Sequence, residues 1–375
     1  VTLEGEGTMQ FSGGLPVGFG AGAHTTLTMS TDVPGNMVTL GNGSAIRRLQ
    51  IVDLADRAGA VVAVVSREPG DRVSATITES EIVNPNPNGI SPAGPTGVGL
   101  VVLSLNPNLG DEPAAHEGAA ISAGMVRSLI RSPAGGVGVF AFNFAALGKV
   151  SVKLDGNVVG GGIFANGGVS RPDAVHDAQV WIESHRNLYR DEYPEPCIEI
   201  HPGFNLLGGS GPPVPLPVGE TARNSLRVQS VEDRLEGFAN GIVAVGSRRF
   251  FPLPIAGPTT GNSTDLRLLG TKISTPSCGG APFVSDLDLA GAFSADDALS
   301  PGDGNTLHVV MRGVIGSGSR SNHYGHSVGP SGPLASALQG SGNRLEIVGS
   351  PGGFASTNRQ IDPAPGSEYF TSAAP

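Results

Sequence analysis

Short apolar runs interrupted by glycine dominate the chain, and residues 149–168 (KVSVKLDGNVVGGGIFANGG) show the pattern clearly. Three alternating apolar residues are followed by a Gly-Asn pair, two valines, three glycines and a second short apolar run. Glycine inside a helix costs about 1 kcal/mol per position, and a hairpin would require a longer second strand. The segment therefore predicts very short strands joined by sharp bends.

A three-position unit recurs through the sequence: an apolar residue, a second position three residues later, and an apolar residue two residues beyond it. The units that fit are Ile46-Leu49-Ile51, Ile77-Ser80-Ile82, Met125-Ser128-Ile130, Leu154-Asn157-Val159, Leu268-Thr271-Ile273 and Val309-Arg312-Val314. The units that fit in part are Ile182-His185-Asn187, Val228-Val231-Asp233 and the half unit Ile347-Ser350. The shortest intervals between units set the repeat, and the longer intervals indicate loop insertions.

This long period predicts an all-β solenoid. Each coil would contain two or three short strands, and successive coils would stack about 4.8 Å apart so that equivalent strands pair in parallel. A small polar residue at the bend, such as Asn157, would adopt the left-handed conformation and bond its neighbour in the next coil. An all-β sandwich is the alternative fold, but its hairpin turns should recur about every 8 to 12 residues.

The repeat resembles the right-handed parallel β-helix of the pectin-lyase-like superfamily, from about Val1 to about Ser350. The resemblance implies an all-β domain over residues 1–350 with roughly ten coils and loop insertions. Ser, Thr or apolar residues are expected at most positions of an asparagine ladder. Residues 351–375 are expected to form a capping tail, because an end coil exposes unpaired edges. Phe354, Ile361 and Phe370 would cover the last coil.

Composition supports a chain of strands and turns. Glycine and proline supply 57 and 30 of the 375 residues, whereas charged residues make up only 15%, which leaves little material for amphipathic helices. A hydrophobic fraction of 39% argues against disorder. Cys197 and Cys278 permit one disulfide, but their wide separation in sequence favours two buried thiols.

The charge balance restricts the partners. The net charge is −10 and no basic run is present, so nucleic acid is excluded as a partner. An anionic polymer would be repelled unless calcium or a local arginine patch intervened. No apolar run reaches the roughly 18 residues of a membrane-spanning segment. The chain begins at Val1 without methionine, which suggests processing, and its lysine-poor composition fits secretion to the cell surface or the extracellular space.

Aromatic, basic and acidic residues concentrate in residues 171–201, which contain the only tryptophan. Aromatic faces suit sugar rings, and two acids near one glycosidic bond could supply an acid and a base or nucleophile. The candidate catalytic residues are Asp177, Asp191, Glu192, His185 and Arg186. The candidate substrate-binding residues are Trp181, Tyr189, Arg190, His176 and Asp173. The alternative is an insertion whose charges satisfy one another and whose Trp181 covers an edge of the core.

A second group of residues is similar to the polygalacturonase motifs NTD, DD, GHG and R-x-K. In order along the chain it comprises Asp265 in NSTD, Asp296 and Asp297 in SADDALS, His326 in YGHSVG, and Arg344 in GNRLE. The second glycine after His326 is absent, and Glu346 stands where that family has a basic residue. Solvated turn residues are the alternative interpretation.

Metal motifs are sparse. His323 and His326 form an H-x-x-H pair in a Ser-Gly loop rather than on a helix, so a zinc site is not expected. Asp286 and Asp288 share one strand face, where they would hold a surface calcium or remain two solvated acids. No other cofactor is expected.

The sequence leads to two functional hypotheses. In the first, the chain is an exported β-helix protein that binds or cleaves a polysaccharide along a lateral groove, because known members of the resembled superfamily most often act on polysaccharides. Asp177, Asp191 and Glu192 would then perform acid-base work. In the second, the chain is a non-catalytic surface or structural solenoid that self-associates by end-to-end stacking of coils.

Overall fold

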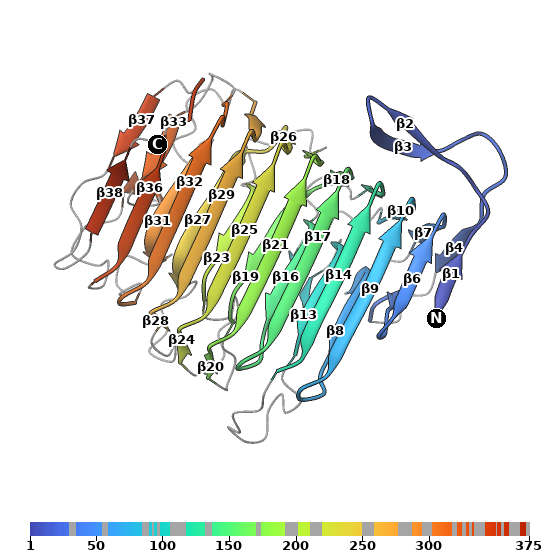
Figure 1. Ribbon diagram of the computed structural model, residues 1–375, viewed down its shortest axis with the longest axis horizontal. Coiled ribbons are helices and arrows are strands. Elements are labelled where there is room, and N and C mark those ends of the chain that lie inside the picture. The colour runs from blue at the N-terminus through green and yellow to red at the C-terminus, as the bar shows by residue number, and fades with distance from the viewer. Residues whose placement is uncertain are drawn as a thin grey trace.

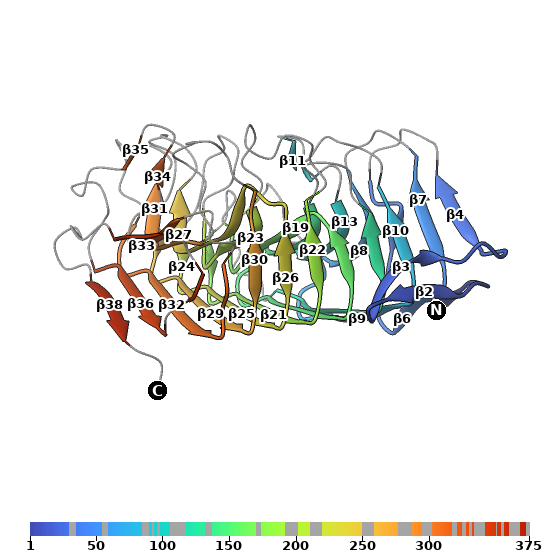
Figure 2. The same cartoon turned by 90° about the horizontal axis from the view of Figure 1, so that it is seen from above.

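The computed structural model consists of strands and turns, and the described residues contain no helix (Figure 1). The described residues are 1–29, 35–54, 59–84, 90–91, 94–95, 98–105, 118–131, 137–169, 174–191, 202–210, 220–249, 259–276, 287–294, 302–316, 321–324, 328–329, 332–333, 342–349, 351–353, 356–359 and 368–372. Most strands belong to three long sheets, which run side by side along the long axis of the molecule (Figures 1 and 2).

We number the three sheets in the order in which one coil visits them. Sheet 1 has eleven strands: β1 (Thr2–Glu4), β6 (Ser44–Arg47), β9 (Arg72–Thr78), β14 (Ala120–Val126), β17 (Lys149–Asp155), β21 (Gln179–His185), β25 (Ser225–Val231), β29 (Ser263–Leu269), β32 (Thr306–Arg312), β36 (Arg344–Val348) and β38 (Glu368–Ser372). Sheet 2 has eight: β4 (Thr26–Met29), β7 (Gln50–Asp53), β10 (Glu81–Val83), β15 (Leu129–Arg131), β18 (Val158–Gly160), β22 (Leu188–Arg190), β26 (Arg234–Glu236) and β30 (Lys272–Ser274).

Sheet 3 has ten strands: β5 (Val38–Thr39), β8 (Ala60–Ser66), β13 (Val98–Ser104), β16 (Val137–Asn143), β19 (Gly162–Asn166), β23 (Pro202–Leu207), β27 (Asn240–Arg249), β31 (Leu287–Ser294), β33 (Ser321–Tyr324) and β37 (Ser356–Arg359). Three coils have an additional short strand just before their strand of sheet 1. These strands pair with one another in a separate parallel sheet: β20 (Val175–His176), β24 (Thr221–Ala222) and β28 (Thr259–Thr260). Three antiparallel hairpins complete the described strands: β2 (Met9–Ser12) with β3 (Leu15–Phe19), β11 (Ile90–Ser91) with β12 (Gly94–Pro95), and β34 (Val328–Gly329) with β35 (Gly332–Pro333).

Neighbouring strands within sheets 1, 2 and 3 pair in parallel throughout. Because the next strand in each sheet belongs to the following circuit of the chain, the arrangement is consistent with a β-solenoid. Apolar side chains from all three sheets meet in one core cluster that extends from Leu40 to Ile347. The predicted all-β class and parallel stacking are confirmed.

The recurring units align into columns, with one correction. Ile46, Ile77, Met125 and Leu154 face one another across four strands of sheet 1. The next members of that column are Ser184 and Ser230, which are buried but polar. The apolar pattern therefore placed the units that begin at Ile182 and Val228 two residues too early. The same shift affects the last two units, because Met311 rather than Val309 pairs with Leu268 of the column, and Ile347 pairs with Val309. Side chains alternate with a period of two, so this shift leaves an inward residue inward and passes unnoticed in the sequence.

A ladder of polar residues fixes the corner between sheets 1 and 2. The backbone N–H of Ser128 donates to Oδ1 of Asn157 at 2.8 Å, and the N–H of Asn157 donates to Oδ1 of Asn187 at 2.8 Å. The predicted bond from Asn157 to its neighbouring coil is thus confirmed. The left-handed residue is instead the preceding one, Gly156 with φ 64° or Arg186 with φ 56°.

A second ladder, at the corner where the chain enters sheet 1, consists of four asparagines: Asn224, Asn262, Asn305 and Asn343. The backbone N–H of each of the first three donates to Oδ1 of the next, at 2.9 to 3.1 Å. The expectation that other residues replace most of an asparagine ladder is therefore wrong at this corner. The Gly-Asn pairs at 261–262, 304–305 and 342–343 were its signal, because each places a left-handed glycine before the ladder residue.

One complete circuit occupies residues 149–166, where β17, β18 and β19 follow one another with bends at Gly156 and Gly161. The glycine run in this segment reflects close contact between coils. A Cβ atom on Gly162 would lie 2.1 Å from the carbonyl oxygen of Gly203, so a side chain there would collide with the next coil. This close approach accounts for Gly162, and the left-handed backbone with φ 81° accounts for Gly161.

The C-terminal strands β37 and β38 extend sheets 3 and 1. Phe354 and Ile361 lie outside the described residues, and the capping role of residues 351–375 stays a prediction. Self-association through coil stacking also stays a prediction. No helix among the described residues has the length and apolar character that a membrane crossing requires.

Candidate functional site

The outer face of sheet 1 carries an exposed aromatic side chain from the 171–201 cluster. Trp181 lies in the middle of β21 and is 43% exposed, because residues at odd positions of this strand point away from the core. The ammonium of Lys153 lies 5.8 Å from the centre of the indole ring and 3.0 Å from Oε2 of Glu183. A cation is therefore held beside an accessible aromatic face.

Charged residues continue across the neighbouring strands. Trp181 is in register with Arg227 of β25, which is followed in the same row by Asp265, His308 and Glu346. Asp265 lies 3.7 Å from Nε of Arg227, 3.3 Å from Nη2 of Arg267 and 3.4 Å from Nδ1 of His308. This residue, which resembles part of a polygalacturonase motif, is therefore surrounded by basic groups on the face of a sheet. Arg344 lies 3.3 Å from Glu346 on β36, and Asp296, Asp297 and His326 lie outside the described residues.

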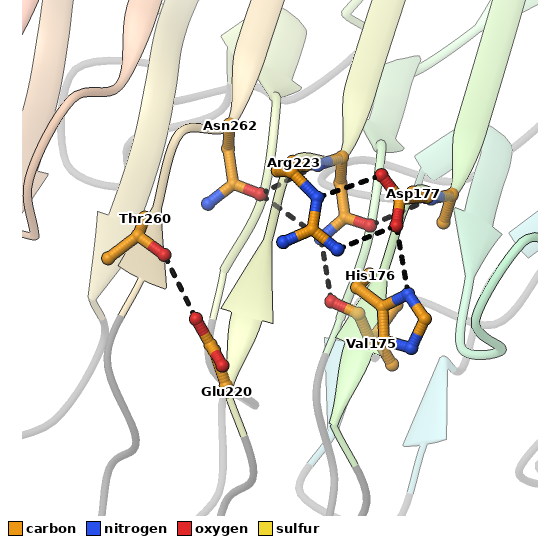
Figure 3. Close-up of polar contacts among 9 residues, drawn as sticks. Val175, His176, Asp177, Glu220, Arg223, Thr260 and Asn262 are labelled. Atoms are coloured by element: carbon orange, nitrogen blue, oxygen red, sulfur yellow. Dashed lines mark hydrogen bonds and ion pairs between the residues drawn. The ribbon is translucent and has the colours of Figure 1, made fainter. Parts of the chain in front are cut away.

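Asp177 is held by two basic residues at the corner before β21 (Figure 3). Arg223 donates from Nε to Oδ1 at 3.0 Å and from Nη2 to Oδ2 at 2.7 Å, and Nδ1 of His176 lies 3.0 Å from Oδ2. The hydrogen bonds from Arg223, with a smaller contribution from His176, lower the pKa of Asp177 to about 2. Asp177 is therefore ionised at neutral pH and unsuited to donate a proton to a leaving group.

His185 and Arg186 lie at the opposite end of β21. The side chain of Arg186 donates to Oδ1 of Asp155 at 2.8 Å, and this contact raises the pKa of the guanidinium further. His185 stands in register with Asp155 and Val231, and its Nε2 atom is buried without a hydrogen-bond partner among the described residues. Neither residue faces the carboxylate of Asp177.

Tyr189 lies in the core rather than on a ligand-facing surface. It is fully buried, its hydroxyl is 2.6 Å from Oγ of Ser184, and its ring meets Phe204 edge-on with centroids 5.0 Å apart. Burial raises the pKa of its phenol well above the usual range. Tyr189 is therefore removed from the candidate sugar-stacking residues.

The remaining candidates are dispersed. Arg190 donates to Oε2 of Glu236 at 3.1 Å on sheet 2, and Asp191 follows directly after β22. Asp177 and Asp191 are separated by the seven residues of β21 and by β22, and β21 alone spans roughly 20 Å. A glycosidase needs its two carboxyl groups within about 5 to 10 Å. Asp173 and Glu192 lie outside the described residues.

The described residues test neither the calcium prediction nor the prediction for the two cysteines. Asp286, Cys197 and Cys278 lie outside the described residues, and the side chain of Asp288 is not described. Within the part of the chain that is described, no group of three or more His, Cys, Asp and Glu side chains is placed to hold a metal ion.

Sequence reasoning missed most of the charged residues around Trp181 on the outer face of sheet 1, although it singled out Asp265 as part of a different motif. Lys153, Arg227, Asp265 and His308 come from four strands that are widely separated in sequence, and Lys153 lies in the neighbouring outward row, in register with Glu183. Their shared signal is an odd position within a seven-residue strand, which becomes visible only after the strands have been aligned correctly.

We compared the chain with models of protein families, with curated proteins and with solved structures, and none of them matched.

Proposed function

We propose that the protein binds a polysaccharide on the outer face of sheet 1, with Trp181 as the stacking residue. The observation that supports this most directly is the exposure of Trp181 to 43% on a regular sheet, beside the ammonium of Lys153. A tryptophan buries a large apolar area when its ring is covered, and its ring face suits the apolar face of a sugar. An exposed tryptophan in this setting is therefore available for a ligand.

The shape of the face favours an extended chain. Equivalent outward positions recur about every 4.8 Å along sheet 1. A linear polymer laid along the solenoid would therefore meet Trp181 and then the polar side chains of Arg227, Asp265 and His308 in succession. These three side chains supply donors and acceptors for sugar hydroxyl groups.

We propose that the protein binds the polysaccharide, and the proposal does not require that it cleaves it. Asp177 is kept ionised by Arg223, and the carboxylate of Asp265 is already engaged by basic neighbours. Asp177 and Asp191 are too far apart to act on one glycosidic bond. If a reaction occurs, its acid and base come from another combination of residues.

The finer description of the fold belongs to the same proposal. We infer a right-handed parallel β-helix of the pectin-lyase-like kind, because connections between parallel strands of one sheet are right-handed in about 98% of cases. A polysaccharide ligand would also fit an extracellular or cell-surface location.

The single tryptophan of the chain provides a direct test. Oligosaccharides from a panel of neutral and acidic glycans should change its fluorescence, and Trp181→Ala should weaken binding about tenfold or more, measured by calorimetry. Trp181→Phe should retain part of the affinity.

Phe11→Ala is the matched control, because Phe11 is 42% exposed and has Arg127 at 5.8 Å from its ring, but lies on the β2–β3 hairpin. Absence of binding across the panel, or equal weakening by Phe11→Ala, would contradict the proposal.

A further inference from the structure

A pocket of about 440 Å³ lies on the outer face of sheet 1, on the N-terminal side of Trp181. It extends over β9, β14 and β17 and reaches the turn residues before these strands. The side chains that matter for its chemistry belong to Arg72, Ser74, Ala120, Ser122, Leu147 and Lys149. None of these residues belongs to the aromatic and charged cluster of residues 171–201.

Strand register explains the hollow. Ala120 of β14 pairs with Arg72 on one side and with Lys149 on the other. Because adjacent strands are about 4.8 Å apart, the two basic residues start roughly 10 Å from each other across a floor that has only a methyl group. In the next outward row, Ser122 pairs with Ser74 and Ser151, so short hydroxyl side chains continue the floor.

The two basic side chains have no acidic partner among the described residues. By contrast, Arg48, Arg127, Arg186 and Arg223 each form an ion pair with a carboxylate. The acid nearest to Arg72 in sequence is Asp71. Its carboxylate already accepts hydrogen bonds from the hydroxyl of Ser66 at 2.8 Å and from the backbone N–H of Arg72 at 2.8 Å. In a chain of net charge −10, two uncompensated cations around one pocket form a local basic site.

We propose that this pocket binds the anionic group, carboxylate or sulfate, of an acidic sugar residue. The guanidinium of Arg72 and the ammonium of Lys149 would hold the anion from opposite sides, and Ser74 and Ser122 would donate hydrogen bonds from the floor. The inference rests on the proposed polysaccharide function, and it names the substrate class as an acidic glycan.

The pocket is continuous with the Trp181 surface. Lys149 is in register with Gln179, and Ser151 with Trp181, on the directly adjacent strands β17 and β21. A chain that stacks on Trp181 can therefore place a neighbouring sugar residue over Ser151 and its charged group between Lys149 and Arg72. The rest of the surface need not attract the polymer, because the charge contact is confined to this pocket.

The test compares glycans that differ only in charge. A mannuronate hexamer and neutral mannohexaose share one backbone, and a sulfated oligosaccharide with its desulfated form provides a second pair. Calorimetry on the wild-type protein should show at least one acidic member binding about tenfold tighter than its neutral partner. The double variant Arg72→Gln/Lys149→Gln should lose that preference and keep the affinity for the neutral member.

Arg234→Gln/Lys272→Gln is the matched control. These two exposed residues are paired neighbours on β26 and β30 of sheet 2, and their replacement removes the same charge from a different face. The preference should survive in this control, and the single variant Lys149→Gln should show an intermediate loss. Unfolding midpoints of all variants establish that each protein is folded.

The possible results distinguish failure of the pocket assignment from failure of the proposed polysaccharide function. Equal affinity for acidic and neutral members, a preference that persists in the Arg72/Lys149 double variant, or its loss in the sheet 2 control would overturn the pocket assignment alone. Failure to bind any glycan would overturn the proposed function itself. Inorganic sulfate is a further probe: competition by the free ion as strong as that of the hexamer would exclude recognition of a sugar residue.

Discussion

Asn187 donates its backbone N–H to Oδ1 of Asp233, 2.8 Å away, at the one step where the ladder between sheets 1 and 2 changes from an amide to an acid. Oδ2 of Asp233 accepts the hydroxyl of Ser230 at 2.7 Å. Burial raises the pKa of Asp233 above its ordinary value of 3.8, in spite of these hydrogen bonds. Folding therefore favours the protonated form of this side chain.

A pH dependence of stability follows from Asp233. With a raised pKa in the folded state, its contribution is most favourable below pH 3.8 and becomes less favourable as pH rises through the folded-state pKa. Asp233→Asn should remove this loss and raise the free energy of unfolding at pH 8 by about 1 kcal/mol, because an amide can donate to a carbonyl of the preceding coil as Asn187 donates to Leu154. Urea unfolding at pH 4 and pH 8 measures the effect, and a variant less stable than the wild type at pH 8 would contradict it.

The ladder before sheet 1 should tolerate substitution poorly. Asn262 accepts the N–H of Asn224 at 3.1 Å and donates to the carbonyl of Thr221 at 3.0 Å, all in a buried corner. Asn262→Ala leaves both backbone groups unpaired and should lower the free energy of unfolding by about 2 to 4 kcal/mol. Thr260→Ala, two residues away and exposed at its hydroxyl contact with Glu220, is the control and should cost below about 1 kcal/mol. Similar losses in the two variants would mean that the ladder adds no specific stability.

Close contact between coils should be sensitive to a single methyl group. Gly162→Ala would place its Cβ 2.1 Å from a backbone oxygen of the next coil and should destabilise by about 1 to 3 kcal/mol. Gly124→Ala is the matched control on the outer face of β14, where the nearest atom to the new Cβ is 3.8 Å away. Thermal unfolding should separate the two variants. Equal midpoints would show that the coils can move apart without cost.

The contact between Arg223 and Asp177 should be visible in an acid titration. Its stabilising contribution is present above the ordinary pKa of 3.8 and is lost as pH falls through about 2. The carboxylate is 39% exposed, so Arg223→Gln should cost below about 1 kcal/mol at pH 7. The carboxyl resonance of Asp177, followed by NMR, should titrate at a higher pH in this variant. An unchanged titration would show that Arg223 does not hold this carboxylate.

The repeat could be predicted because its strongest features are local. Apolar residues such as Ile77 and Ile82 sit on the two sides of one bend, at a separation that the bend itself fixes. Polar residues in the inward column concealed the alignment of two coils, since Ser184 and Ser230 are buried by partners outside their own strand. The second ladder escaped notice because its asparagines directly precede the strands of sheet 1 and lie outside the recurring three-position unit.

The site was only partly accessible to the same reasoning. Trp181 stands out as the single tryptophan, but its neighbours Lys153 and Arg227 depend on the register between strands. Inserted loops of unequal length hide that register in the sequence. Arg72 and Lys149 were invisible as a pair for a further reason: their significance lies in the small Ala120 between them and in the absence of acidic partners among the described residues.

The ladder of four asparagines from Asn224 to Asn343 makes the two ends of the solenoid inequivalent. Each side-chain Oδ1 accepts a backbone N–H of the coil on its N-terminal side, and each side-chain Nδ2 donates to a backbone carbonyl of that same coil. Losing one asparagine therefore leaves a backbone donor and a backbone acceptor of the preceding circuit unpaired. Unravelling that begins at the C-terminal end would remove, one after another, the side chains that bind the preceding circuit, whereas unravelling from the opposite end would remove the backbone groups that these side chains bind. The two ends should therefore differ in how readily they fray.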